Sequence, residues 1–170
     1  MWSGDSVARI KNAVLDTGPL THLGQIDSLK VFRVFQDILL SEDVVRELGD
    51  ASRFPANCKV SRLKGRAKDM SKLIMEEYGL GAGESTAIAL AKQEGVSLVF
   101  TDDLEAREVA RSYGLEPHGT LAIVTRAYRE NIIGKREAIA CIDRLHRYST
   151  LYLTVDLVHW AISQIDKHDK

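Results

Sequence analysis

The sequence predicts an α/β fold in which helices cover both faces of a central parallel sheet of four to five strands. Short apolar runs of strand length alternate along the chain with longer stretches whose apolar residues recur at helical spacing. Strands that alternate with helices favour a parallel sheet, because each helix returns the chain across one face of the sheet. With 170 residues, the chain has the usual length of one domain. We therefore expect a single domain over residues 12–170, preceded by an N-terminal tail over residues 1–11.

The first half of the chain holds two predicted strands and the helical segments that follow them. Each strand is a short apolar run, and each helix has apolar residues three and four positions apart. Ser41 has the position and chemistry of an N-cap, and Gly49 directly follows a short helix. In order, the expected elements are a strand over 12–16, a helical segment over 20–35 that breaks near Gly24, a strand over 36–40 and a helix over 44–48.

The second half begins with a basic segment, residues 51–72, and then alternates regularly. This segment holds seven Lys or Arg and one acid, Asp69. Such a run of charge is usually a solvated face, and the alternative is that it follows a phosphate backbone. Thr154 is the expected cap of the last helix. In order, the expected elements are an edge strand near 58–60, helices over 66–78 and 84–94, a strand over 96–101, a helix over 104–113, a strand over 115–117, and helices over 120–128, 135–147 and 155–165.

Composition narrows the class of protein. A net charge of −1 and a pI near 6.5 give no overall sign of nucleic-acid binding. Cys58 and Cys141 lie far apart without a C-x-x-C pair, so neither a zinc site nor a disulfide framework is indicated. No stretch approaches the roughly 20 apolar residues of a membrane span, and the N-terminus lacks the apolar core of a secretory signal. The expected location is the cytoplasm.

Five acidic side chains lie at the edges of the apolar segments: Asp16, Glu47, Glu84, Asp102 and Asp103. The first of them and the last pair follow predicted strands directly, and the ends of parallel strands share the sheet edge where open α/β folds keep their sites. Carboxylates that converge repel one another, and a divalent cation, a raised pKa or a cationic partner relieves the repulsion. The pattern therefore predicts a site for Mg²⁺ or Mn²⁺, ions that activate water for attack on a phosphodiester.

Each acid also has a structural interpretation. Asp16 could begin an Asx-turn, Glu84 suits the first turn of a helix, and Asp102 suits the N-cap of the helix after it. Glu47 is the exception, because the helix dipole disfavours a negative charge near a helix C-terminus. The metal interpretation depends on the joint pattern, since Asp16 and Asp102 both follow strands.

Four segments, in this order, resemble the motifs of the PIN-domain ribonucleases. They are Val14-Leu15-Asp16-Thr17-Gly18-Pro19-Leu20, Val44-Val45-Arg46-Glu47-Leu48, Gly83-Glu84-Ser85-Thr86-Ala87-Ile88-Ala89-Leu90-Ala91 and Phe100-Thr101-Asp102-Asp103. Gly114 and Gly119-Thr120-Leu121 are similar to a prokaryotic branch of toxin-nuclease-like PIN proteins. The resemblance covers residues 12–165.

The resemblance implies a three-layer α/β/α sandwich and metal-dependent cleavage of RNA with Mg²⁺ or Mn²⁺. It often implies a toxin role beside a small antitoxin protein, and a homodimer. The catalytic acids carried over from the family would be Asp16, Glu47, Glu84, Asp102 and Asp103. The metal ligands would be Asp16, Glu84, Asp102 and Asp103, and Glu47 would bind metal or order water. The chain departs from the commonest motifs at Glu84, where many relatives have Asp, and at Gly18, where Ser or Thr is frequent.

Substrate contacts are expected beside these acids. The side chains predicted to contact RNA are Thr17, Arg107, Arg111 and Thr120. The two arginines have a structural alternative, which is pairing with acids of their own helix. Because water is the expected nucleophile, cleavage would leave 3′-hydroxyl and 5′-phosphate ends.

Two other classes of function stay open. One is a catalytically weak or inactive PIN-like module that binds RNA or a protein partner. The other is a phosphoryl-transfer domain of the receiver or haloacid-dehalogenase type, which also places Asp after a first strand. Those families need a second Asp two residues later or a Lys after a late strand, and Asp16-Thr17-Gly18 lacks the former.

Two further groups of side chains have only structural expectations. His22 and His118 lie close to predicted strand-end loops and are not assigned to the site. Trp160, with Leu157 and Ala161 at helical spacing, is expected to pack against the rest of the domain. If that stripe is exposed, it predicts a dimer or partner surface.

Overall fold

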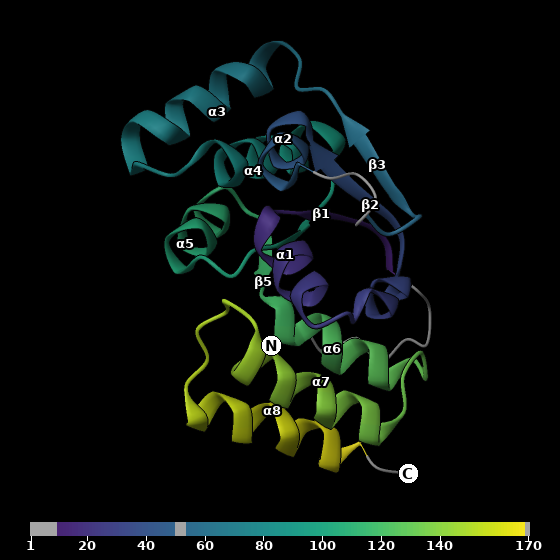
Figure 1. The fold of residues 1–170 in the computed structure, drawn as a ribbon. Helices are drawn as coiled ribbons and strands as arrows, with labels where there is room; N and C mark the ends of the chain where they lie inside the picture. The colour runs from purple at the N-terminus through teal and green to yellow at the C-terminus, as the bar shows by residue number, and fades with distance from the viewer. Residues whose placement is uncertain (1–9, 50–53, 169–170) are drawn as a thin grey trace.

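The computed structural model describes residues 10–49 and 54–168, and a five-stranded parallel sheet lies at its centre (Figure 1). The strands follow the spatial order β3-β2-β1-β4-β5, and every neighbouring pair is parallel. This confirms the predicted α/β fold with four to five parallel strands. The strands are β1 (Ile10–Leu15), β2 (Phe35–Ser41), β3 (Cys58–Ser61), β4 (Leu98–Phe100) and β5 (Glu116–His118).

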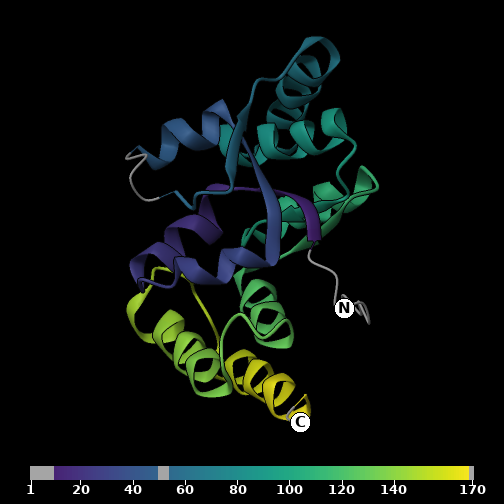
Figure 2. The same cartoon turned by 90° about the vertical axis from the view of Figure 1, so that its right-hand side faces the viewer.

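Helices cover both faces of the sheet (Figure 1, Figure 2). One buried apolar cluster joins one face to α1, α6, α7, α8 and the 3-10 helix η1, and a second joins the other face to α3, α4 and α5. The helices are α1 (Thr17–Gln25), η1 (Leu29–Val34), α2 (Glu42–Leu48), α3 (Gly65–Tyr78), α4 (Ala82–Glu94), α5 (Leu104–Ser112), α6 (Thr120–Arg129), α7 (Lys135–Tyr148) and α8 (Val155–Lys167).

The two clusters follow from the alternation of side chains along a strand. In β1, Ala13 and Leu15 belong to one cluster and Val14, between them, belongs to the other. All three side chains are fully buried. A central parallel strand buried on both faces needs an apolar run without polar interruption. The apolar run that predicted the strand therefore also buries the end of β1. Asp16 directly follows this buried end.

The helical segment predicted over residues 20–35 is divided in the structure. α1 ends at Gln25, η1 follows, and Phe35 is already the first residue of β2. Asp27 has a positive φ of 54°, so the chain turns directly after α1. Phe35 is fully buried and packs edge-on against Phe100 of β4, with ring centroids 5.0 Å apart. Phe35 matched the helical spacing of the apolar residues before it, although in the structure it belongs to β2. β1 also starts at Ile10, two residues earlier than predicted, and residues 1–9 of the predicted tail lie outside the described residues.

Helix caps agree with the sequence at two positions and differ at a third. The predicted N-caps Ser41 and Thr154 are confirmed, because each hydroxyl accepts a hydrogen bond from a backbone N–H three residues later. The cap of α5 is Asp103, whose Oδ1 accepts from the N–H of Ala106 at 2.7 Å. The interpretation of Asp102 as the cap is therefore wrong, and its carboxylate has other partners.

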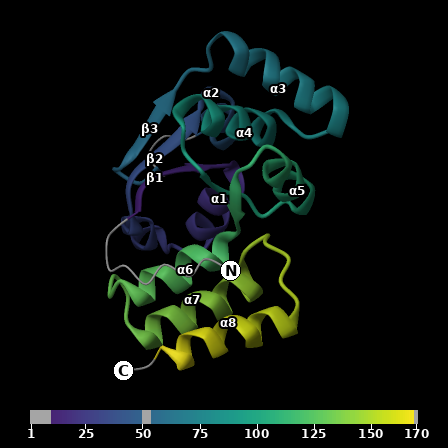
Figure 3. The same cartoon turned by 180° about the vertical axis from the view of Figure 1, so that it is seen from behind.

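The C-terminal helices α6, α7 and α8 pack together on one side of the sheet, opposite α3 (Figure 3). On α8, Val158 and Ala161 are buried, but Leu157 is 40% exposed and Trp160 is 42% exposed. The prediction that this stripe packs against the domain is therefore wrong for Leu157 and Trp160. No helix in the described part of the chain has both the length and the apolar character needed to cross a bilayer.

Candidate functional site

The carboxyl ends of β1 and β4 lie side by side, and an acid follows each. Leu15 pairs in register with Phe100, and the backbone N–H of Asp16 donates to the Phe100 carbonyl at 2.9 Å. Thr101 and Asp102 directly follow that carbonyl in the chain. The parallel topology thus brings residues 85 positions or more apart in sequence to one edge of the sheet.

Asp16 is buried among other acids. Its side-chain Oδ1 accepts from the backbone N–H of Thr17 at 2.7 Å, which caps α1, and Oδ2 accepts from Thr101 Oγ1 at 2.9 Å. Only 4% of the residue is exposed. This burial, together with the nearby charges of Glu84 and Glu47, raises the pKa of Asp16 to about 6 despite the two hydrogen bonds. The surroundings therefore compensate its negative charge incompletely.

Glu47 and Glu84 come from α2 and α4, two helices that hydrogen bonds tie together. Glu47 Oε1 accepts from the backbone N–H of Gly83 at 2.9 Å, and Ser41 Oγ lies 2.7 Å from Thr86 Oγ1. A Cβ at position 83 would lie 2.6 Å from Glu47 Oε2, so glycine is required for this close approach. The N-terminus of α4 stabilises the negative charge that the C-terminal end of α2 disfavours. This contact gives a structural role to Glu47, which was the acid with the weakest structural interpretation from the sequence.

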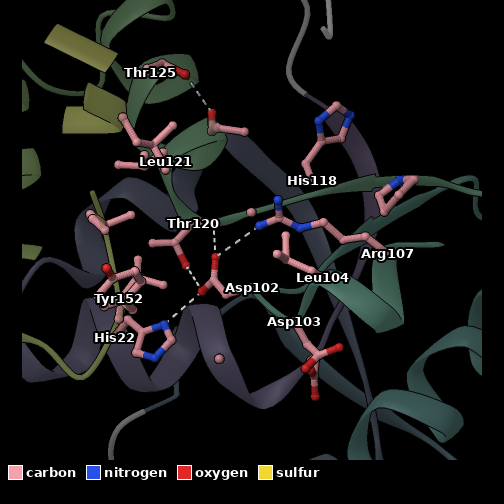
Figure 4. Close-up of a pocket in the computed structure, with 18 of the residues that line it drawn as sticks. His22, Asp102, Asp103, Leu104, Arg107, His118, Thr120, Leu121, Thr125 and Tyr152 are labelled. Atoms are coloured by element: carbon pink, nitrogen blue, oxygen red, sulfur yellow. Dashed lines mark hydrogen bonds and ion pairs between the residues drawn. The ribbon is translucent and has the colours of Figure 1, made fainter. Parts of the chain in front are cut away.

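Asp102 has the opposite environment, in which several donors surround it (Figure 4). Oδ2 lies 2.8 Å from His22 Nδ1 and accepts from Thr120 Oγ1 at 2.5 Å, and Oδ1 accepts from the Thr120 N–H at 2.7 Å. Burial alone would raise the pKa of Asp102, but the hydrogen bonds from His22 and Thr120 hold it below its ordinary value. Because an ionised carboxylate only accepts, Nδ1 is the nitrogen through which His22 donates.

Arg107 completes this second group. Its Nε donates to the Thr101 carbonyl at 2.8 Å, and its Nη2 lies 3.6 Å from Asp102 Oδ1. The side chain lies against Gly119, where a Cβ would collide with the guanidinium and would lie 2.9 Å from Asp102 Oδ1. The predicted alternative of pairing within the helix is therefore wrong for Arg107. It is confirmed for Arg111, which pairs with Glu108 of the same helix.

Most of the side chains described above line a pocket of about 1100 Å³ at the sheet edge, next to α6 and α8. The side chain of Asp103, which is exposed, points away from Asp102 in this pocket (Figure 4). Glu47 does not belong to the pocket lining. The other predicted site residues all line it: Asp16, Thr17, Glu84, Asp102, Asp103, Arg107, Arg111 and Thr120.

A family model described as a PIN domain matches residues 12–167, which is nearly the whole chain. The chain belongs to the PIN-domain family. No curated protein and no solved structure matches it. The resemblance found in the sequence motifs is therefore confirmed at the level of the family, and the α/β/α arrangement of this PIN domain agrees with it.

The acids of this PIN domain suit a divalent ion in donor type and in charge. Carboxylate oxygens are the ligands that Mg²⁺ prefers, and the pKa of the Asp16 carboxylate is raised by burial and by the charges of two other acids. Within residues 10–49 and 54–168, no group of three His, Cys, Asp or Glu side chains is already arranged around one point for an ion. Glu47 instead accepts a hydrogen bond from the Gly83 N–H, and the carboxylate of Glu84 lies next to Gly81.

His22 lines the pocket and Thr101 donates a hydrogen bond to Asp16, and neither residue was assigned to the site from the sequence. Thr101 holds Asp16, and His22 holds Asp102. A signal for His22 exists in hindsight: Gly18 and His22 are one turn apart on α1, and a Cβ at position 18 would lie 3.4 Å from Asp102 Oδ2. Local spacing could place Gly18 and His22 on one helix face, but only the tertiary fold brings Asp102 to that face.

Residues 54–72, the described part of the basic segment 51–72, are outside this site and do not line the pocket. Lys59 pairs with Asp37 at 2.9 Å and Arg62 with Glu42 at 3.1 Å, as expected for a solvated face. Arg53 falls outside the described residues. The arginines of the pocket come from α5 and α6 instead.

Proposed function

We propose that this PIN-domain protein is a metal-dependent endoribonuclease that hydrolyses RNA phosphodiester bonds with Mg²⁺ or Mn²⁺. The observation that supports the proposal most strongly is the state of Asp16. Burial of its carboxylate at the end of a central strand, together with the nearby charges of Glu84 and Glu47, raises the pKa of Asp16 to about 6. A divalent cation bound at this site would compensate that negative charge.

The proposed ligands lie on the Asp16 side of the pocket. Asp16 and Glu84 line the pocket, and Asp103 lines it with only Oδ1 used to cap α5. Glu47 adds negative charge near Asp16 from outside the pocket lining. When bound to these residues, a divalent cation supplies Lewis acidity at the scissile phosphate and neutralises developing charge.

Asp102, although predicted from the sequence as a ligand, receives a different role in this proposal. Both of its oxygens already accept hydrogen bonds, from His22 on α1 and from Thr120 at the start of α6. Arg107 is held beside it. We assign Asp102 to fixing these segments around the pocket, so that the RNA-contacting side chains keep their positions.

The remaining residues of the pocket would bind and orient the substrate. Arg107 and Arg111 lie one turn apart on α5 and line the pocket, where guanidinium groups suit phosphate oxygens. Thr17 and Thr101 hold Asp16 in one orientation through fixed hydrogen bonds. Hydrolysis with water as the nucleophile would leave a 3′-hydroxyl and a 5′-phosphate.

The biological setting extends the proposal. The family resemblance supports a toxin whose partner is a small antitoxin protein, with the PIN domain as a homodimer. Growth arrest on expression in a bacterial host, relieved by the product of an adjacent small gene, would support this setting. Growth arrest by an Asp16→Asn variant equal to that by the wild type would contradict a nuclease toxin.

The test of the activity is cleavage of labelled single-stranded and structured RNA by purified protein in Mn²⁺, in Mg²⁺ or in EDTA. Wild type is compared with Asp16→Asn and with Asp143→Asn, a matched control on α7 that pairs with Arg147 and does not line the pocket. We expect metal-dependent cleavage by wild type and control, and none by Asp16→Asn. Cleavage in EDTA, or equal cleavage by Asp16→Asn, would contradict the proposal.

A further inference from the structure

Exposed apolar side chains of this protein are concentrated near its C-terminus. Among the described residues, five of the nine large hydrophobic side chains that are exposed lie between positions 148 and 160. They are Tyr148, Tyr152, Val155, Leu157 and Trp160. Three of these five, together with Leu104 on α5, line the same pocket as the acids. Exposed apolar groups gathered at one pocket mark a binding surface.

Tyr152 is held outward by a loop that is fixed on both sides. The backbone N–H and hydroxyl of Thr150 both donate to Gln25 Oε1, at 2.8 Å and 3.1 Å, which anchors the loop to the end of α1. On the other side, Leu153 is buried in the core formed with the C-terminal helices. Tyr152 is nevertheless 86% exposed and belongs to the pocket wall (Figure 4). Because its loop is anchored, a ligand that contacts the ring would not have to order the loop backbone as well.

Trp160 gives the pocket a second aromatic side chain. It lies on α8, which packs against α6, the helix that carries the pocket-lining Arg129. Arg111 of α5 lines the pocket as well. The pocket therefore combines two partly exposed aromatic rings with guanidinium groups. The acids proposed for hydrolysis line the same pocket.

We propose that Tyr152 and Trp160 form a stacking subsite for the bases of an RNA strand whose phosphates lie along the pocket arginines. The proposal rests on the proposed nuclease function. It adds that the protein recognises bases of the RNA away from the bond that is cleaved. Aromatic rings stack on any base, because every base has a π-face, and nearby arginines add charge for the backbone. A strand with bases stacked on the rings and phosphates beside the arginines matches both features, whereas an apolar protein segment matches the aromatic rings alone.

Tryptophan fluorescence gives a direct test, because Trp2 and Trp160 are the two tryptophans of the chain. In a Trp2→Phe background, Trp160 is the single reporter. Binding of a short single-stranded oligoadenylate is measured in EDTA, beside an abasic ribose-phosphate chain of the same length. We expect the oligoadenylate to quench Trp160 and the abasic chain to bind more weakly without quenching. Equal binding and equal fluorescence change with both chains would overturn the subsite.

Substitutions at Tyr152 sharpen the test. Tyr152→Ala is expected to weaken oligoadenylate binding by about tenfold, the usual effect of losing one stacked base, whereas Tyr152→Phe keeps the ring and keeps the affinity. Tyr148→Ala is the matched control, since Tyr148 is 72% exposed in the same region but does not line the pocket. Equal affinity of the wild type and Tyr152→Ala would overturn the proposal.

Failure of this inference is distinguishable from failure of the nuclease proposal. Base-dependent quenching without cleavage in Mn²⁺ would sink the nuclease and keep the subsite. Cleavage in Mn²⁺ with no base-dependent quenching would keep the nuclease and sink the subsite. Sedimentation of the same variants adds the protein alternative. If Tyr152→Ala and Trp160→Ala convert a dimer to a monomer and the RNA leaves Trp160 fluorescence unchanged, the surface belongs to a second copy of the chain and the subsite is excluded.

Discussion

Asp16 and Asp102 follow neighbouring strands of one sheet, and the protein treats them in opposite ways. Asp16 has two donors and two acidic neighbours, and its pKa rises to about 6. Asp102 is also buried, but donors from His22 and Thr120 lower its pKa, and Arg107 lies beside it. Burial is common to both carboxylates, so the partners decide the direction of the shift. The pocket therefore has two sides. On the Asp16 side the negative charge lacks a cationic partner among the described residues, and on the Asp102 side hydrogen-bond donors and Arg107 already compensate it.

The motif of an acid directly after a strand can therefore have two different roles, metal ligand or structural element. An acid after a strand is a candidate metal ligand when its charge is uncompensated, and a structural element when donors from several helices converge on it. Asp16 fits the first description and Asp102 the second.

The largest expected difference is in RNA cleavage. Asp16→Asn should lower the cleavage rate by at least about 100-fold, because a ligand is lost, and Asp102→Asn by about tenfold, because only the positions of its neighbours change. Initial rates on one labelled RNA in Mn²⁺ measure both. If Asp102→Asn loses as much activity as Asp16→Asn, the division of the pocket is wrong.

The pH dependence of stability should have opposite signs at the two acids. The folded-state pKa of Asp16 is raised above 3.8, so its contribution is fully present below about pH 4 and lost as the pH rises through about 6, a change of about 3 kcal/mol. The lowered pKa of Asp102 gives stability that is present above about pH 4 and lost at lower pH. Urea unfolding of each Asn variant against wild type, from pH 3 to about pH 7, resolves the two curves. Parallel curves for the two variants would show that their environments do not differ.

At pH 7 the two substitutions should move stability in opposite directions. Asp16→Asn relieves a buried, poorly compensated charge and should raise the free energy of unfolding by about 1–2 kcal/mol. Asp102→Asn weakens the hydrogen bonds from His22 and Thr120 and should lower that free energy by about 2 kcal/mol. Chemical denaturation without added metal measures both. Destabilisation by Asp16→Asn as large as that by Asp102→Asn would contradict the assignment.

A smaller effect is expected at Gly83, where Glu47 is held. In Gly83→Ala the new Cβ would lie 2.6 Å from Glu47 Oε2, so the flexible carboxylate turns away from its place near Asp16. We expect Mn²⁺ affinity to change by a few-fold, on the order of one weak electrostatic contact, with little loss of folding stability. Gly24→Ala is the control, because nothing lies within 4 Å of a Cβ there. Equal metal affinity in both variants would remove Glu47 from the site.

The sequence predicted the strands and helices that carry the site better than the hydrogen bonds between its side chains. The apolar run before Asp16 and the helical stripe after Glu84 identified their elements, because strand and helix periods are local properties. The cap at α5 was assigned to Asp102 instead of Asp103, since two adjacent acids satisfy the same capping signal. His22 was not assigned because its partner, Asp102, lies 80 residues away, and no local pattern reports that contact.

The C-terminal region shows a second kind of limit. Trp160 matched the spacing of buried neighbours such as Ala161, and a helical stripe does not show how far burial extends around the helix. The exposure of Tyr152 depends on the anchoring of its loop to Gln25, a contact between residues 125 positions apart. Apolar spacing therefore predicted that α8 packs on the core, but not where its packed face ends.

Calorimetric titration of Mn²⁺ into the wild type, Asp16→Asn and Asp102→Asn tests the central claim most directly. The account predicts that the wild type and Asp102→Asn bind the ion with similar affinity and that Asp16→Asn does not bind it at millimolar concentration. Retained binding in Asp16→Asn, or its loss in a folded Asp102→Asn protein, would contradict the claim that the acids around Asp16 form the metal-binding side of the pocket.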